Sequence, residues 1–177
     1  MKKSIVVVDG SNLYYKLKEL KFSNTSSFNY SKFSLHISEN TKLINKYYCI
    51  GKIRADQESK KARLMMAKQQ SLMTKLQKSK FIIQFGYLLK SGNRYHEKGV
   101  DVQIATNLLV GAFKNEYDTA FLVSSDSDIV PAVRECKGLE KKIVYVGFEH
   151  KPSFALMRSC SETKLLTKKD LELFMGR

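Results

Sequence analysis

The stretch DTAFLVSSDSD, Asp118–Asp128, carries the strongest indication of fold class in this chain. Its middle, Thr119–Val123, is a short apolar run, which is typical of a strand that is buried on both faces in a parallel sheet. Three serines and two aspartates follow at once. Open α/β sheets place their sites at the carboxyl ends of the strands, so we expect these polar side chains to face a functional site.

A second stretch of the same kind opens the chain. In IVVVDGSN, Ile5–Asn12, an apolar run ends in Asp9 and is followed by Gly10, a residue that favours a turn. In a parallel sheet the carboxyl ends of neighbouring strands lie at one edge. We therefore expect Asp9 to lie at the same edge as the aspartates of the first stretch.

Apolar runs and helical periodicities alternate along the rest of the chain. Residues 21–30 and 91–98 are polar and are predicted to be loops. Strands separated by helices indicate a mostly parallel α/β sheet, and the length suits one domain over 1–177. We expect strands at 5–8, 43–53, 81–89, 118–124 and 142–148, and helices at 13–20, 31–39, 57–78, 100–113, 128–139, 153–159 and 168–174.

The composition bounds the partners and the compartment. Lysine and arginine number 31 against 17 aspartates and glutamates, for a net charge of +14, which indicates either a solvated surface or a polyanion partner. No stretch approaches the about 18 apolar residues of a membrane span, and the apolar run before Asp9 is too short for a signal peptide. Three cysteines without metal-binding spacing indicate reduced thiols and a cytoplasmic protein.

Four aspartates are the candidates for chemistry: Asp9, Asp101, Asp126 and Asp128. Carboxylates that share a cleft repel one another, and a bound Mg²⁺ or Mn²⁺ relieves that repulsion because hard cations prefer oxygen ligands. Such an ion polarises a phosphate and activates a water, which suits phosphodiester hydrolysis. Each aspartate also has a structural alternative, because Asp9, Asp126 and Asp128 can cap helices and the helix dipole favours Asp101 in a first turn.

Further polar residues are candidates for contacts with substrate. Asn12 and Ser125 are placed to orient a water or contact a phosphate, and Arg54 lies where strands exit. Arg94 and Tyr95 are expected to hold a phosphate and stack a base, although a plain polar loop would look the same. The lysines of residues 57–80 form either a solvated helix face or a rail for an RNA backbone. The apolar residues of the same helix are predicted to form one stripe on the opposite face: Leu64, Met65, Leu72, Met73 and Leu76.

The motifs resemble the NYN domain of the LabA/DUF88 type. The likeness lies in VVDGSNL (Val7–Leu13), KGVDV (Lys98–Val102), the stretch from Asp118 to Pro131, and VYVGF (Val144–Phe148). It implies a PIN-like (Rossmannoid) fold, a three-layer sandwich with a central mostly parallel sheet flanked by helices. It also implies a Mg²⁺- or Mn²⁺-dependent ribonuclease site.

Carried over by residue, the resemblance assigns the acidic quartet to Asp9, Asp101, Asp126 and Asp128. Asn12 becomes the polar partner of the first strand, and Lys98 matches the lysine that precedes the family's Gly-Val-Asp. Ser125 departs from the pattern, because many members carry glycine there, and its side chain narrows the approach to the metal.

Three functions remain as hypotheses. The first is an endoribonuclease that hydrolyses single-stranded or structured RNA. The second is a non-catalytic RNA-binding or regulatory module with the same fold. The observations that favour it are Ser125 in place of glycine and the high positive charge. The third is another metal-dependent phosphodiesterase that acts on DNA, because fold does not dictate substrate. The resemblance to PIN-like proteins also implies a homo-oligomer.

Overall fold

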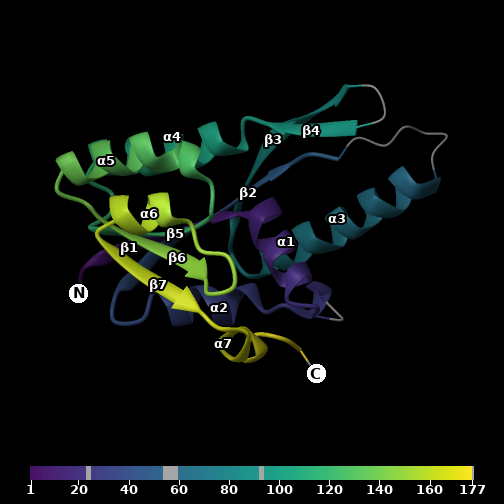
Figure 1. The fold of residues 1–177 in the computed structure, drawn as a ribbon, viewed down its shortest axis with the longest axis horizontal. Coiled ribbons are helices and arrows are strands. Elements are labelled where there is room, and N and C mark those ends of the chain that lie inside the picture. The colour runs from purple at the N-terminus through teal and green to yellow at the C-terminus, as the bar shows by residue number, and fades with distance from the viewer. Residues whose placement is uncertain (23–24, 54–59, 92–93, 177) are drawn as a thin grey trace.

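One sheet runs through the whole molecule (Figure 1). The computed structural model describes residues 1–22, 25–53, 60–91 and 94–176, and in these the sheet has seven strands in the order β4-β3-β2-β1-β5-β6-β7. Among the strands of the described residues, only β4 is antiparallel to its neighbour. The strands are β1 (Lys3–Asp9), β2 (Lys42–Gly51), β3 (Ile82–Ser91), β4 (Arg94–Lys98), β5 (Thr119–Val123), β6 (Lys142–Phe148) and β7 (Glu162–Leu166).

The central strand β1 explains why its sequence is a continuous apolar run. It pairs in parallel with β2 on one side and with β5 on the other. Val6 and Val8 point into one hydrophobic cluster, while Ile5 and Val7 point into a second cluster on the opposite face. Both faces are buried, so the pattern has no polar alternation.

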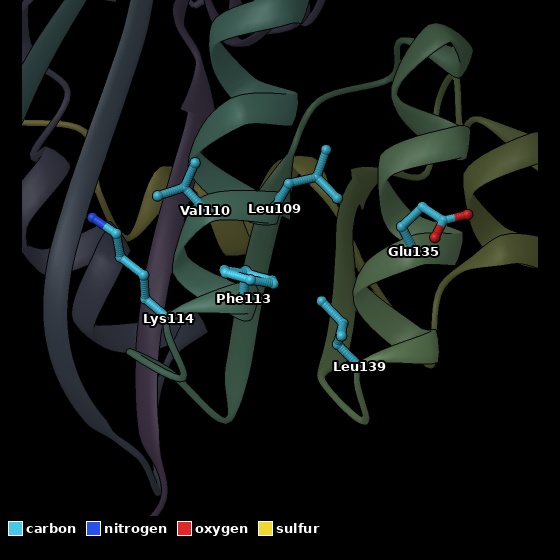
Figure 2. A pocket seen from close by; sticks show the side chains of 6 residues that line it. All are labelled: Leu109, Val110, Phe113, Lys114, Glu135 and Leu139. Carbon is cyan, nitrogen blue, oxygen red and sulfur yellow. The ribbon is translucent and has the colours of Figure 1, made fainter.

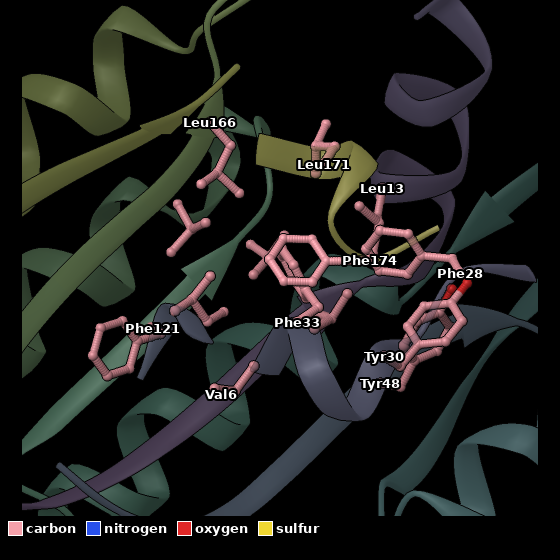
Figure 3. Close-up of a cluster of buried hydrophobic side chains, with 14 of the residues drawn as sticks. Val6, Leu13, Phe28, Tyr30, Phe33, Tyr48, Phe121, Leu166, Leu171 and Phe174 are labelled. Carbon is pink, nitrogen blue, oxygen red and sulfur yellow. The ribbon is translucent and has the colours of Figure 1, made fainter. Parts of the chain in front are cut away.

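Helices cover both faces of the sheet, so the predicted three-layer sandwich is confirmed. Leu13 of α1, Phe33 of α2 and Leu76 of α3 pack in the cluster of Val6, which Figure 3 shows with Phe174 close to the short helix α7. The other face is covered by α4, α5 and α6. The helices are α1 (Gly10–Glu19), α2 (Tyr30–Ile37), α3 (Lys60–Lys78), α4 (Val100–Phe113), α5 (Val130–Gly138), α6 (Phe154–Ser159) and α7 (Lys168–Glu172), with 3₁₀ turns η1 (Thr25–Ser27) and η2 (Ser127–Ile129).

The two edge strands differ from the sequence-based expectation. The segment 91–98 was predicted to be a loop, but Arg94–Lys98 forms β4, antiparallel to β3. No strand was predicted over Glu162–Leu166, which forms β7 beside β6. Edge strands bury little side-chain surface and are often polar, so neither segment carries the apolar pattern by which inner strands are recognised.

Helix α3 was predicted with one apolar stripe, and only its second half packs that way. Leu76 is buried, whereas Leu64 and Met65 are exposed. Residues 57–59 of the predicted helix lie outside the described residues. The buried Gln69 also attaches α3 to the sheet. Its side chain donates to the carbonyl of Gly51 at 2.8 Å and accepts the N–H of Ile53 at 3.0 Å, so it links α3 to the end of β2.

Candidate active site

A cavity of about 430 Å³ lies where β1 and β5 end and α4 begins. The four predicted aspartates all line it, although they come from three separate parts of the chain. Lys98, a predicted RNA contact, is exposed and lines the same cavity. The lining residues are Asp9, Lys98, Gly99, Val100, Asp101, Val102, Asp126 and Asp128.

Asp9 is the last residue of β1 and is buried. Its Oδ1 accepts the backbone N–H of Asn12 at 2.9 Å, which caps α1. Its Oδ2 accepts the hydroxyl of Ser124 at 3.1 Å. The structural role and the proposed chemical role are therefore compatible, because capping directs the carboxylate toward the edge of the sheet where the cavity lies.

Ser124 connects the two strand ends, and sequence reasoning did not single it out. Its hydroxyl is buried, donates to Asp9 and accepts the backbone N–H of Asp126 at 3.1 Å. Asp126 in turn accepts the N–H of Asp128 at 2.9 Å and caps η2. The only sequence signal is a serine two residues before an aspartate, a spacing at which a hydroxyl reaches a backbone N–H.

Asp101 reaches the cavity from the first turn of α4. The residue at the N-cap is Gly99, with φ of 80°, and it makes no side-chain cap hydrogen bond. A left-handed residue at that place turns the chain sharply from β4 into α4, which is a conformation that glycine adopts at least cost. The turn aims the amino end of α4 at the acidic edge, where its dipole favours carboxylates.

Asn12 and Ser125 each hold a buried oxygen without a partner. Asn12 Oδ1 and Ser125 Oγ make no hydrogen bond to any residue that the structure describes. The backbone N–H of Asn12 is bonded to Asp9, and Ser125 directly precedes Asp126, but neither residue is among those that line the cavity. A buried polar atom without a partner is costly unless a ligand or water satisfies it. Of the other predicted contacts, Arg54 lies outside the described residues. Arg94 and Tyr95 belong to β4, but their side chains also lie outside the description.

The donors around the cavity fit a hard divalent cation. They are the carboxylate oxygens of the four lining aspartates. In the described part of the chain, no three histidine, cysteine or acidic side chains meet closely enough to form a complete metal cage. Mg²⁺ does not need one, because it is commonly held by one or two carboxylates and keeps waters or phosphate oxygens as its other ligands.

Cys49 lies beside this site on β2, in register with Asp9. Burial, and secondarily the charge of Asp9, raises the pKa of its thiol to about 12, which Asn107 partly offsets by hydrogen bonding. Gln84 accepts from Cys49 Sγ at 3.5 Å and donates to Asn107 Oδ1 at 3.0 Å. The thiol is therefore protonated at neutral pH, and this polar group ties α4 to β2 and β3.

A second cavity of about 480 Å³ has a different character (Figure 2). It lies between α4 and α5, toward the end of α4 opposite Asp101. Its lining is mostly apolar, and Lys114 and Glu135 are the charged residues among the described ones that line it. The residues around it are Leu109, Val110, Phe113, Lys114, Glu135 and Leu139.

The three layers and the acidic edge define a PIN-like α/β protein. The model of the NYN domain family matches residues 3–166, and the chain belongs to that family. NYN domains have a nuclease-like fold and are typically nucleases that use divalent metals. Among the described residues, no helix is both long and apolar enough to cross a bilayer.

A solved structure supports the fold. A protein of unknown function, VPA0982 from Vibrio parahaemolyticus RIMD 2210633, is 19% identical, with a TM-score of 0.72 over 99% of this chain and 96% of that chain. The nicotinamidase SaPncA from Staphylococcus aureus is 10% identical over 98% of this chain and 89% of that chain, and its TM-score of 0.33 is too low to indicate a common fold. No curated protein matches the chain.

Proposed function

We propose that this protein is a Mg²⁺- or Mn²⁺-dependent endoribonuclease that hydrolyses RNA phosphodiester bonds. The observation that carries the proposal is the gathering of four aspartates around one cavity in a chain whose net charge is +14. The acidic residues suit a cation, and the basic balance suits a nucleic acid around it.

Each residue has a role in this proposal. Of Asp9, Asp101, Asp126 and Asp128, which line the cavity, one or two would hold the ion directly, and waters or phosphate oxygens would complete its ligands. When bound, the ion would offset the charge of the carboxylates, polarise a phosphate oxygen and activate a water. Asn12 Oδ1 accepts a hydrogen bond from that water and thereby orients it. The hydroxyl of Ser125 donates to a phosphate oxygen.

The basic residues hold the RNA. Lys98 pairs with a phosphate at the cavity rim, and Arg54, Arg94 and Tyr95 are proposed to extend the contact along the strand. Their contribution should make binding dependent on salt. A cytoplasmic location and a homo-oligomer stay predictions from the sequence.

The decisive experiment compares two aspartates of one motif. Asp126→Asn keeps the side-chain shape but removes a charge from the cavity, so cleavage of RNA oligomers with Mg²⁺ or Mn²⁺ should fall at least a hundredfold. Asp118→Asn is the matched control at the opposite end of β5, where Asp118 accepts the N–H of Lys3 at 2.7 Å, and its activity should stay within twofold. Equal cleavage by Asp126→Asn and the parent would place the chemistry elsewhere.

Metal binding is tested apart from activity. Mn²⁺ titration followed by electron paramagnetic resonance should show binding to the parent protein and weaker binding to Asp126→Asn. Matched RNA and DNA oligomers separate a ribonuclease from a phosphodiesterase that acts on DNA. RNA binding without turnover under any divalent ion would favour the non-catalytic module. The observation that favours this module is the buried hydroxyl of Ser125, at a position where many family members carry glycine.

A further inference from the structure

An exposed apolar face lies on β3, outside the cavity. Phe85, Tyr87 and Leu89 are 39%, 67% and 58% exposed, and they alternate along the strand, so they share one face. The opposite face is occupied by α4: Gln84 bonds Asn107, and a Cβ atom on Gly86 would lie 2.7 Å from Val100 Cγ2. The three side chains, here called the β3 platform, therefore belong to the side that α4 does not cover.

The β3 platform adjoins the acidic cavity. Tyr87 pairs with Lys98 across the β3–β4 ladder, so the two side chains emerge on the same side. A Cβ atom placed on Gly99 would lie 3.7 Å from Cδ2 of Tyr87, so the ring lies beside Gly99. Lys98 and Gly99 both line the cavity. A ligand that leaves the cavity past Lys98 therefore meets the ring of Tyr87 next.

Cations accompany the aromatic rings. Lys52 Nζ lies 5.7 Å from the centre of the Phe85 ring, and Lys98 lies across from Tyr87. A ligand that matches such a surface combines negative charges with flat apolar groups in a regular order. Single-stranded nucleic acid has this chemistry, because its phosphates pair with cations while its unpaired bases stack on aromatic side chains. In a duplex those base faces are already covered by their neighbours.

We infer that the β3 platform stacks unpaired bases of a single strand whose phosphate lies at the acidic cavity, with Tyr87 as the principal stacking residue. The inference rests on the proposed function only in that nucleic acid occupies the cavity. Its consequence is a preference for unpaired over duplex segments next to the scissile bond. The rings bind and position the strand so that one of its phosphates lies at the cavity that the aspartates line.

The test measures binding without cleavage. Fluorescence anisotropy of a labelled single-stranded RNA, in EDTA, compares the parent with Tyr87→Ala, Tyr87→Phe and the control Phe154→Ala, whose ring is 71% exposed on α6. Loss of one base–aromatic stack should weaken binding by about five- to a hundredfold for Tyr87→Ala. Tyr87→Phe keeps a ring and should bind within threefold of the parent, as should Phe154→Ala.

Two further arms isolate stacking from charge. An oligomer of the same length with abasic sites keeps its phosphates, so it should bind equally to the parent and to Tyr87→Ala. A duplex of the same sequence should also bind both proteins equally. Circular dichroism melts of each variant check that the fold is intact.

Opposite results separate the two proposals. If Tyr87→Ala binds the single strand as tightly as the parent, or loses affinity for the abasic oligomer by the same factor, the β3 platform does not stack bases and the inference is overturned. Cleavage that still depends on Asp126 would then leave the proposed function standing. Conversely, binding that depends on Tyr87 without any turnover would overturn the catalytic proposal alone.

Discussion

Among single residues, Ser124 holds the acidic edge together. Its hydroxyl spans the ends of β1 and β5 by donating to Asp9 and accepting from the backbone of Asp126. Both partners line the cavity, so a small change at Ser124 alters the orientation of two carboxylates at once.

Ser124→Ala should therefore affect stability and activity together. Removing the hydroxyl leaves a buried carboxylate oxygen and a backbone N–H without this partner, which costs about 1–3 kcal/mol of unfolding free energy. We expect at least a tenfold loss in RNA cleavage, measured beside urea unfolding. Ser127→Ala, at an exposed position of η2, is the control and should change neither quantity. A fully active and equally stable Ser124→Ala protein would contradict this role.

The buried thiols predict alkaline destabilisation. Burial raises the pKa of Cys49 to about 12 and that of Cys160 to about 11, and it also raises the pKa of Cys136. Above the ordinary thiol pKa near 9 the unfolded chain loses these protons while the folded chain keeps them. The contribution of these thiols to the unfolding free energy is therefore fully present below about pH 9, and it is lost as pH rises through the folded pKa values.

Urea unfolding from pH 7 to pH 10.5 should show this decline. Cys49→Ala removes one contributor, so its unfolding free energy should fall less steeply over the same range, whatever its stability at pH 7. Equal slopes for the variant and the parent would show that Cys49 does not hold its proton in the folded state.

At the level of elements, the contact between the β3–β4 hairpin and α4 places Asp101. Gly86 lies where β3 passes α4, and an added Cβ atom would come within 2.6 Å of the Lys98 carbonyl oxygen and 2.7 Å of Val100 Cγ2. The backbone of one element therefore touches the first turn of the other, and only glycine leaves room for it.

Gly86→Ala should force these elements apart. We expect a loss of about 1–3 kcal/mol of unfolding free energy from overpacking, and lower cleavage because Asp101 moves with α4. Gly138→Ala is the matched control, because its Cβ atom would meet nothing within 4 Å. That substitution, near the end of α5, should be neutral or stabilising by up to about 1 kcal/mol. Similar destabilisation of both variants in urea would contradict the contact.

For the whole molecule, the net charge of +14 predicts strongly salt-dependent binding. Neutralising several phosphates releases condensed counterions, so raising salt from about 50 to about 200 mM should weaken RNA binding at least tenfold. Anisotropy titrations in EDTA measure this directly. The affinity of Tyr87→Ala should fall with salt concentration with the same slope as that of the parent, because the tyrosine ring neutralises no phosphate. An affinity independent of salt would mean that the basic surface serves solubility alone.

Most of the inner fold was predictable from the sequence, and the edges were not. β1 and β5 are recognised because strands buried on both faces need continuous apolar runs. β4 consists of polar and charged residues with one tyrosine, and β7 begins with Glu-Thr-Lys, so neither segment carries the continuous apolar run by which the inner strands are recognised. Leu64 and Met65 were placed in an apolar stripe by periodicity, but periodicity does not report where a helix leaves the core.

The candidate site divides in the same way. Local pattern is enough to predict that Asp9 and Asp126 follow buried strands and that Asp101 begins a helix, because strand burial and helix starts depend on residues close in the chain. Their meeting around one cavity, the hydroxyl of Ser124 between two strand ends, and the ring of Tyr87 beside Gly99 depend on segments far apart in the chain. Such contacts exist only once strand order and helix packing bring those segments together.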